Sequence, residues 1–357
     1  MRKNFRGTTK TVLVGGLLAM AAVGCGGGSS ATTASGGGAA SGAASPAAGT
    51  HKIAAVFSGS VTASGWDRDG KAALDAMAST MGVKASTIES LAYDKASQTL
   101  DRLANQGYDI IIAHSSGFEP SVLEVAPKHP KTQFILFSDI STTTPPPNVA
   151  AWKINWNELG YLVGTAMCTI SPTGNVGHVS SAPIPAFTRL AGGLAQATES
   201  EGNCKGKKDA LKITFTGSFT DAALAKSAAL SILGKGADVL SDGADAAGKA
   251  VVASAIEKKI PYVGGLFDVA PDGPGVVATS IPINFNSAYA EMGKLLSDGT
   301  IKQGGIYDVD VKSGGLDYTK PVKIVPNAAD VTKALDSAIS RIKDGSLSID
   351  PKREIKG

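Results

Sequence analysis

The chain has 357 residues, of which 43% are hydrophobic and 18% are charged, and its formal net charge is +3. It is too long for one ordinary hydrophobic core and too apolar for a disordered chain, so we expect two globular lobes. The first 24 residues include four basic and no acidic residues; without them the chain has 30 basic and 31 acidic residues. No basic run alternates with aromatic residues, so we expect no nucleic-acid partner.

The N-terminus has the pattern of a secretory signal peptide. A basic start is followed by an apolar stretch over residues 11–23 and by small residues before Cys25, a segment too short for a comfortable membrane span. The sequence AVGC at 22–25 resembles a bacterial lipobox, although Ala22 replaces the usual leucine. We therefore expect residues 1–24 to be removed and Cys25 to be lipidated; an ordinary signal peptide cut near an alanine is the alternative.

A tether is expected to follow Cys25. Residues 26–50 are rich in Gly, Ala, Ser and Thr and carry no charge, a composition typical of a flexible linker. Such a linker would connect a lipid anchor to a folded domain. The pattern thus predicts a lipid-anchored protein on the extracytoplasmic face of the cell membrane.

From residue 51 onward, short apolar runs alternate with helical patterns. The runs are typical of buried strands in parallel sheets, and Gly or Pro closes many of the helices. We expect strands within 52–57, 108–114, 132–139, 174–181, 211–218, 237–243 and 260–266. We expect helices within 71–82, 97–107, 119–130, 156–171, 187–202, 221–236 and 247–259. This alternation predicts an α/β protein with doubly wound parallel sheets, whose ligands bind beyond the carboxyl ends of the strands.

The enzyme motifs that such sheets often carry are missing. The sequence has no GxSxG elbow, no phosphate-binding loop and no GxGxxG after the first strand. Asp139 and Asp268, at two strand ends, would be an acid and base pair only with a nucleophile or metal beside them. The four histidines are scattered, so we expect neither a metal nor a cofactor. An enzyme is therefore our third hypothesis, after two binding functions that are given below.

Two cysteines remain after Cys25. Cys168 and Cys204 each lie near the end of a predicted helix, in a compartment where thiols oxidise. Helices that flank one strand would bring the two Cα atoms within the roughly 4.4 to 6.8 Å that a disulfide requires. We predict that they are bonded, unless the helices lie on opposite faces of the sheet.

Two aromatic residues stand at predicted strand ends. Trp66 follows the Gly/Ser loop after the first strand, and Phe219 follows the strand within 211–218. We expect them to face each other and clamp a flat ring; the alternative for Trp66 is a plug at the end of the core. His114 and Phe118 are second-tier candidates for lining the cleft.

The sequence from about residue 51 to residue 320 resembles the basic membrane protein family of PnrA-like substrate-binding lipoproteins. Several segments carry the likeness in the same order, among them NVAAWKINWNELGYLVGTAM, TGNVGHVSSAPIPAFTR and GSFTDAALAKSAALSILGKGADVLSDGAD. The resemblance implies a type I periplasmic-binding-protein fold, with two Rossmann-like lobes joined by a hinge of three crossing segments. The expected parts are a signal peptide (1–24), the lipidated Cys and tether (25–50), an N-terminal lobe (51–151 plus 282–310), a C-terminal lobe (152–281 plus 311–330), and a C-terminal helical segment and tail (331–357).

The resemblance also implies a ligand and the residues that hold it. Family members bind purine nucleosides, in some cases free purine bases, and in one branch a flavin. The implied roles are a ring sandwich for Trp66 and Phe219, the base edge for Asp139, sugar hydroxyls for Asp245 and Asp268, and a position near the hinge for Trp156. Asp139 and Asp245 would otherwise be turn or helix-capping residues. Leu266 stands where the family often has an acid, which suggests a less hydroxylated ligand.

These expectations combine into one functional hypothesis. The protein would be a monomeric, lipid-anchored solute-binding protein that delivers a purine nucleoside or related heterocycle to the permease of an ABC importer. The main alternative is a ligand-sensing receptor for a membrane signalling protein.

Overall fold

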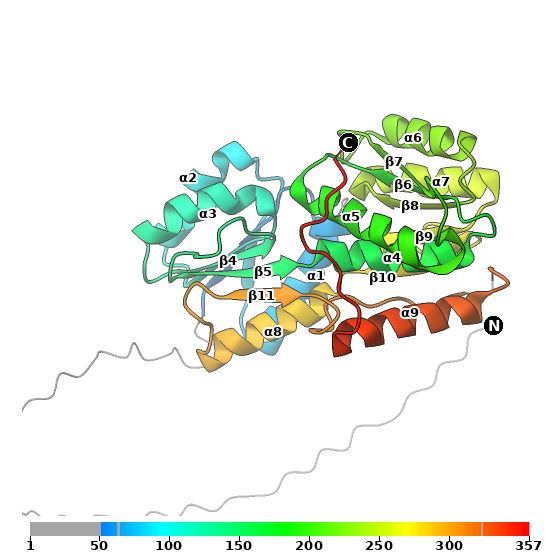
Figure 1. The fold of residues 1–357 in the computed structure, drawn as a ribbon. Coiled ribbons are helices and arrows are strands. Elements are labelled where there is room, and N and C mark those ends of the chain that lie inside the picture. The colour runs from blue at the N-terminus through cyan, green and yellow to red at the C-terminus, as the bar shows by residue number, and fades with distance from the viewer. Residues whose placement is uncertain (1–50, 63–64, 323, 357) are drawn as a thin grey trace, which may run out of the picture. The chain divides into compact units, whose positions relative to one another are not determined.

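Two parallel β-sheets organise the part of the chain that the computed structural model describes, residues 51–62, 65–322 and 324–356 (Figure 1). Sheet A has the strand order β11-β5-β4-β3-β1-β2 and sheet B the order β10-β9-β8-β6-β7. In sheet A the strands are β1 (Ile53–Val56), β2 (Ala85–Ile88), β3 (Ile110–Ala113), β4 (Gln133–Ser138), β5 (Val149–Ile154) and β11 (Ile306–Val309). In sheet B they are β6 (Val176–Ser180), β7 (Leu211–Phe215), β8 (Val239–Gly243), β9 (Tyr262–Leu266) and β10 (Val277–Pro282).

Helices cover both faces of each sheet. On sheet A, α1 (Gly65–Thr80) and α8 (Phe285–Asp298) pack on one face, and α2 (Ala96–Asn105) and α3 (Glu119–Val125) on the other. On sheet B, α6 (Ala222–Gly234) and α7 (Gly248–Lys258) cover one face, and α4 (Trp156–Ile170) and α5 (Pro185–Ser200) the other. The last helix, α9 (Ala328–Asp344), packs against α4. We call sheet A with its four helices the N-terminal lobe and sheet B with the other five the C-terminal lobe.

The predicted fold class is confirmed. Both sheets repeat one order, 2-1-3-4-5 in sheet A and 7-6-8-9-10 in sheet B, which is the doubly wound arrangement expected from the sequence. The signal peptide, Cys25 and tether predicted for residues 1–50 lie outside the described residues. Among the residues that are described, no helix is both long and apolar enough to span a membrane.

The chain crosses between the lobes at two segments that repeat one short sequence. Residues 154–157 read Ile-Asn-Trp-Asn and residues 283–286 read Ile-Asn-Phe-Asn. Asn155 and Asn284 have nearly the same backbone conformation, with φ and ψ of −83° and 83° against −82° and 78°. Each asparagine caps the next helix by accepting a backbone N–H bond, which satisfies one of the free donors at a helix start. An aromatic residue then occupies the first helical position at each crossing.

The chain crosses between the lobes a third time after β11. This third crossing is hydrogen-bonded to the start of α4, next to the first crossing. Glu158 of α4 accepts a hydrogen bond from the N–H of Val311 at 2.9 Å, and the side chain is buried. Burial raises the pKa of Glu158 to about 7.

Strand β5 ends at Ile154, whereas the sequence placed the first lobe boundary at residue 151. Helix α9 begins at Ala328, whereas the C-terminal segment was expected from residue 331.

The two remaining cysteines are joined in the C-terminal lobe. Cys168 near the end of α4 and Cys204 in a short 3-10 helix form a disulfide with a Cα–Cα distance of 5.2 Å, and both are fully buried. Helices α4 and α5 lie on the same face of sheet B and approach closely. A Cβ atom at Gly160 would collide with the carbonyl oxygen of Leu190. The disulfide therefore fastens the end of a tightly packed helix pair.

We expect the double substitution Cys168→Ala/Cys204→Ala to destabilise the protein. The bond closes a loop across 36 positions, and its removal should cost about 3 to 4 kcal/mol because the unfolded chain regains entropy. Urea denaturation of wild-type and variant protein would measure the difference. Wild-type protein unfolded with a reductant is the matched control, and equal denaturation midpoints in all three samples would contradict the prediction.

Candidate functional site

A row of four aromatic rings runs from the N-terminal lobe into the C-terminal lobe. Trp66 in the first turn of α1 stacks on Trp156 with ring centroids 6.3 Å apart and an interplanar angle of 23°. Trp156 contacts Phe187 of α5 at 5.7 Å, and Phe187 contacts Phe219 at 5.7 Å. The row places Trp156 and Phe187 between Trp66 and Phe219, which we had expected to face each other directly. Phe219 is the exposed end of the row, with 36% of its surface accessible.

Trp66 is fixed by the N-terminal lobe. Its ring lies 5.2 Å from Phe285 and 5.0 Å from His114, and its Nε1–H donates to the carbonyl oxygen of His114 at 2.9 Å. Phe285 is the aromatic residue of the second crossing, so both crossings place a ring against Trp66. Trp66 thus packs against the aromatic residues of both crossings, and it also lies at the sheet edge where we expected a ligand.

The two second-tier candidates are core residues. His114 is fully buried, hydrogen-bonded to the carbonyl oxygen of Trp66 at 3.2 Å and to the hydroxyl of Tyr289 at 2.8 Å. Burial lowers its pKa to about 3, so the imidazole is neutral. Gly70 leaves room for this ring, because a Cβ atom there would collide with it. Phe118 is also fully buried and packs edge-on against Tyr93.

Asp67, beside Trp66, is a buried acid that sequence reasoning missed. Only 3% of its surface is exposed, Oδ2 accepts the N–H of Gly59 at 2.9 Å, and Oδ1 has no hydrogen-bond partner among the described residues. The pKa of Asp67 is raised to about 6, mainly by burial and in part by the charge of Asp245 in the other lobe, while the hydrogen bond from Gly59 opposes the shift. An acid in the first turn of a helix normally complements the helix dipole, so its sequence position did not distinguish it.

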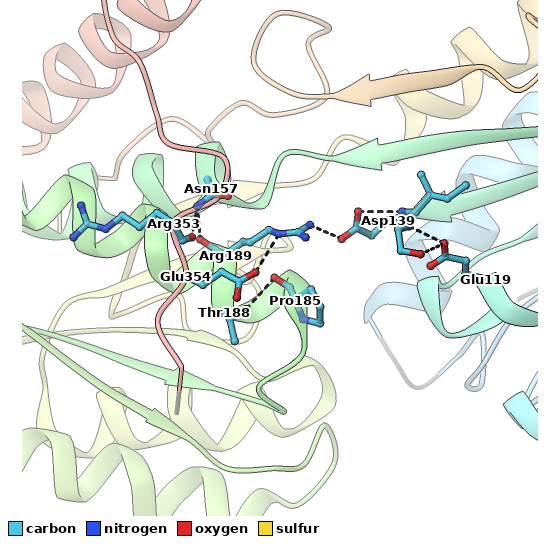
Figure 2. Close-up of polar contacts among 10 residues, drawn as sticks. Glu119, Asp139, Asn157, Pro185, Thr188, Arg189, Arg353 and Glu354 are labelled. Atoms are coloured by element: carbon cyan, nitrogen blue, oxygen red, sulfur yellow. Dashed lines mark hydrogen bonds and ion pairs between the residues drawn. The ribbon is translucent and has the colours of Figure 1, made fainter. Parts of the chain in front are cut away.

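Asp139 makes an ion pair between the lobes (Figure 2). It follows β4 of sheet A, and its Oδ2 accepts from Nη1 of Arg189 on α5 at 2.9 Å, while Oδ1 accepts the N–H of Ile140 at 3.0 Å. Its side chain is 13% exposed. Burial raises the pKa of Asp139, although the charge of Arg189 opposes this shift. Both carboxylate oxygens are therefore already hydrogen-bonded.

The two acids expected to hold sugar hydroxyls lie in different settings. Asp245 begins a 3-10 helix after β8 with φ of 49°, in the left-handed region that non-glycine residues rarely adopt. Its charge raises the pKa of both Asp67 and Asp242. Asp268 is exposed, and its Oδ1 accepts from the N–H of Ala270 and from the hydroxyl of Ser280. The charge of Asp245 thus acts on Asp67 in the N-terminal lobe, whereas Asp268 stabilises a turn in its own lobe.

Buried polar atoms without partners gather at the carboxyl edges of the sheets. Trp156 Nε1, Ser180 Oγ and Ser181 Oγ have no hydrogen-bond partner among the described residues, and each residue is at most 3% exposed. Trp156 starts α4, and the two serines end or follow β6. Buried polar groups are nearly always paired in native proteins, so such a group requires an explanation. Together with Asp67 Oδ1, these atoms offer both donors and acceptors to a bound molecule.

His178 is a further buried polar residue on the same strand, β6. It is fully buried on β6, its Nδ1 lies 2.8 Å from the hydroxyl oxygen of Ser241, and Nε2 has no partner among the described residues. Burial lowers its pKa to about 3. The uncharged ring thus presents an unpaired nitrogen near the aromatic row, since Phe187 and His178 both lie against Gly243.

Two surface hollows lie at the amino edges of the sheets, opposite the carboxyl edges. One is lined by Pro261 and Val276, just before β9 and β10, and another by Asp109 and Gln133, at the amino ends of β3 and β4. Ligands of doubly wound sheets bind at the carboxyl ends. Within the described part of the chain, no group of three or more His, Cys, Asp or Glu side chains is placed to hold a metal ion. The candidate site is therefore the edge marked by the aromatic row.

The fold is that of a two-lobed solute-binding protein. The family model for PnrA-like substrate-binding proteins of ABC transporters matches residues 50–348, and the chain belongs to this extracytoplasmic family. It is 24% identical over 300 residues to a purine-binding protein of Brucella abortus, covering 83% of this chain and 82% of that one. It is 23% identical over 257 residues to the nucleoside-binding protein BmpA of Lactococcus lactis, covering 67% of each chain.

Solved structures share the fold. A solute-binding protein of an ABC transporter system from Aeropyrum pernix has a TM-score of 0.73 and 19% identity, covering 84% of this chain and 92% of its own. Another from Conexibacter woesei has a TM-score of 0.70 and 22% identity, covering 85% and 100%. The predicted family is confirmed, and it is a family of substrate-binding proteins rather than an enzyme class.

The buried carboxyl of Asp67 should make stability depend on pH. Its pKa of about 6 in the folded protein lies above the ordinary value of 3.8, so its contribution is full below about pH 4 and is lost as the pH rises through 6. Asp242 and Glu158, with pKa values of about 6 and 7, act in the same direction. We expect Asp67→Asn to lessen the fall in unfolding free energy between about pH 4.5 and about pH 7.5, a range that extends about 1.5 units on each side of pH 6.

Urea denaturation across this range would measure the effect. Asparagine retains an oxygen that can accept the N–H bond of Gly59, so the loop contact survives the change. Asp75→Asn, on the same helix but 58% exposed at its side chain, is the matched control. Identical pH dependence in wild type and Asp67→Asn would show that the buried carboxyl does not titrate in this range.

Proposed function

We propose that this protein binds a purine nucleoside or a related flat heterocycle between its lobes and delivers it to the permease of an ABC importer. The unpaired buried polar atoms at the carboxyl edges of the two sheets carry this proposal. Trp156 Nε1 offers a donor, Asp67 Oδ1 offers an acceptor, and the hydroxyls of Ser180 and Ser181 offer either. A nitrogen heterocycle carries ring donors and acceptors that match such a set.

The aromatic row supports the same class of ligand. Trp66 and Trp156 stack on each other where the lobes meet, and Phe219 presents an exposed ring at the end of the row. Stacking of a flat ring on such faces contributes about 0.5 to 1.5 kcal/mol beyond the burial of area. The relatives named for purine and nucleoside binding fit this chemistry. In our proposal Asp245 contacts the ligand from the C-terminal lobe, whereas Asp139 acts through its ion pair and Asp268 through its turn.

Ligand identification is the direct test. Mass spectrometry of small molecules released from purified full-length protein should detect a purine or related heterocycle. Calorimetric titration with guanosine, adenosine, inosine, hypoxanthine and riboflavin should then give saturable binding to at least one of them, without turnover. Failure of the whole panel, together with a released ligand that has no flat ring, would reject the proposal.

Variants at the exposed end of the row make the test specific. Phe219→Ala should weaken binding about tenfold, which corresponds to about 1.4 kcal/mol, with little change in the stability of the ligand-free protein because the ring is exposed. Leu224→Ala is a matched control, since Leu224 is also an exposed apolar residue, 47% accessible on the next helix. Equal affinity of Phe219→Ala and wild type would exclude Phe219 from the binding site.

The proposal includes a lipid anchor at Cys25. The lipobox-like AVGC sequence and the uncharged tether of residues 26–50 support it, and an anchor would keep the monomer near its permease. Cys25→Ser should move the protein from the membrane fraction to the soluble fraction of cells, because the serine cannot receive the thioether lipid. An unchanged membrane fraction on immunoblots would contradict the anchor.

A further inference from the structure

The C-terminal tail, which we define as residues 348–356, lies along α5 of the C-terminal lobe (Figure 2). Gln196 donates to the carbonyl oxygen of Ser348 at 2.8 Å and accepts the N–H of Asp350 at 3.0 Å. Arg353 makes a two-nitrogen ion pair with Glu199, one contact of which is 2.8 Å. These contacts join segments more than 150 positions apart in the chain, so the tail is docked by specific side chains.

The tail is docked most closely beside Arg189. The buried amide of Asn157 donates to the carbonyl oxygens of both Arg353, at 2.8 Å, and Arg189, at 3.0 Å. The N–H of Ile355 donates to the carbonyl oxygen of Thr188 at 3.0 Å. Gly192 allows this approach, because a Cβ atom there would collide with the carbonyl oxygen of Arg353. One buried side chain therefore fixes the tail and the backbone of residue 189 together.

Arg189 is held between two acids on opposite sides. Its Nε lies 3.6 Å from Oε1 of Glu354 in the tail, and its Nη1 lies 2.9 Å from Oδ2 of Asp139 in the N-terminal lobe. The two acids contact different nitrogens of the guanidinium, so they do not compete for one N–H group. A flexible arginine side chain loses rotamer freedom when it makes an ion pair. A contact with Glu354 that already restrains the Arg189 side chain would reduce that loss.

We propose that the C-terminal tail is a strap that positions Arg189 for its ion pair with Asp139, so that the tail sets how much of the protein has its lobes in contact. Glu354 and Arg189 are positioning residues in this mechanism. The strap acts on the equilibrium between lobe arrangements, whatever molecule the site binds. A contact present in only one arrangement shifts the population toward it.

The fraction of molecules in each lobe arrangement can be measured without any ligand. Spin labels carried by genetically encoded amino acids at positions 143 and 223, which are exposed in the N-terminal and C-terminal lobes, would report the interlobe distance in the full-length protein. We expect Asp139→Asn and Arg189→Gln each to lower the ratio of the short-distance to the long-distance population about tenfold. Glu354→Gln should lower it about threefold, because it loosens Arg189 without removing the pair.

The decisive comparison is the double variant. In the Asp139→Asn background, Glu354→Gln should have no further effect, since the contact that it supports is already lost. Glu257→Gln, an exposed ion-paired glutamate elsewhere in the same lobe, is the matched control and should leave the ratio unchanged. An unchanged ratio in Glu354→Gln, or an equal shift with and without Asp139, would overturn the proposal, even if ligand binding behaves as proposed above.

Discussion

The two crossings at residues 154–156 and 283–285 are the constraint on which the rest of the structure depends. Each must turn the chain from the end of one sheet into a helix of the other lobe, and each does so with a capping asparagine followed by an aromatic residue. Trp156 and Phe285 therefore arrive at the same place, on two sides of Trp66. The hinge and the candidate site share these rings, so a movement of the lobes changes the surface offered to a ligand.

The sequence was sufficient for most of the strands inside the two sheets, although it missed β5, which lies between β4 and β11. All seven runs named as strands contain one, and an unbroken apolar run such as residues 110–113 is typical of a strand buried on both faces in a parallel sheet. The other three strands that were not predicted, β2, β10 and β11, lie at sheet edges. β2 is an edge strand, half-exposed along its length, and β10 contains Thr279 and Ser280, which hydrogen-bond to Thr319 outside the sheet. Their polar residues are satisfied by tertiary contacts that no local pattern reveals.

The candidate site was only partly predictable for the same reason. Trp66 and Asp139 could be placed at strand ends from order along the chain alone. Their partners could not, since Trp66 meets a ring 90 positions away and Asp139 meets an arginine 50 positions away. The repeat of Ile-Asn-aromatic-Asn was visible in the sequence and would have indicated both crossings. Nothing local, however, marked Asp67 as more buried than Asp69 two positions later.

The contact between the lobes is a balance of opposing terms, and this balance is what a binding protein requires. Burying Asp67 Oδ1, Trp156 Nε1 and Ser181 Oγ without partners costs free energy, typically about 1 to 3 kcal/mol for each unsatisfied group. The stacked rings and the Asp139–Arg189 pair oppose that cost. If the attractive terms were much larger, the lobes would stay together and admit no ligand. A molecule that pairs the buried atoms removes the cost only when the lobes meet around it, so its binding free energy is expressed as a shift between arrangements.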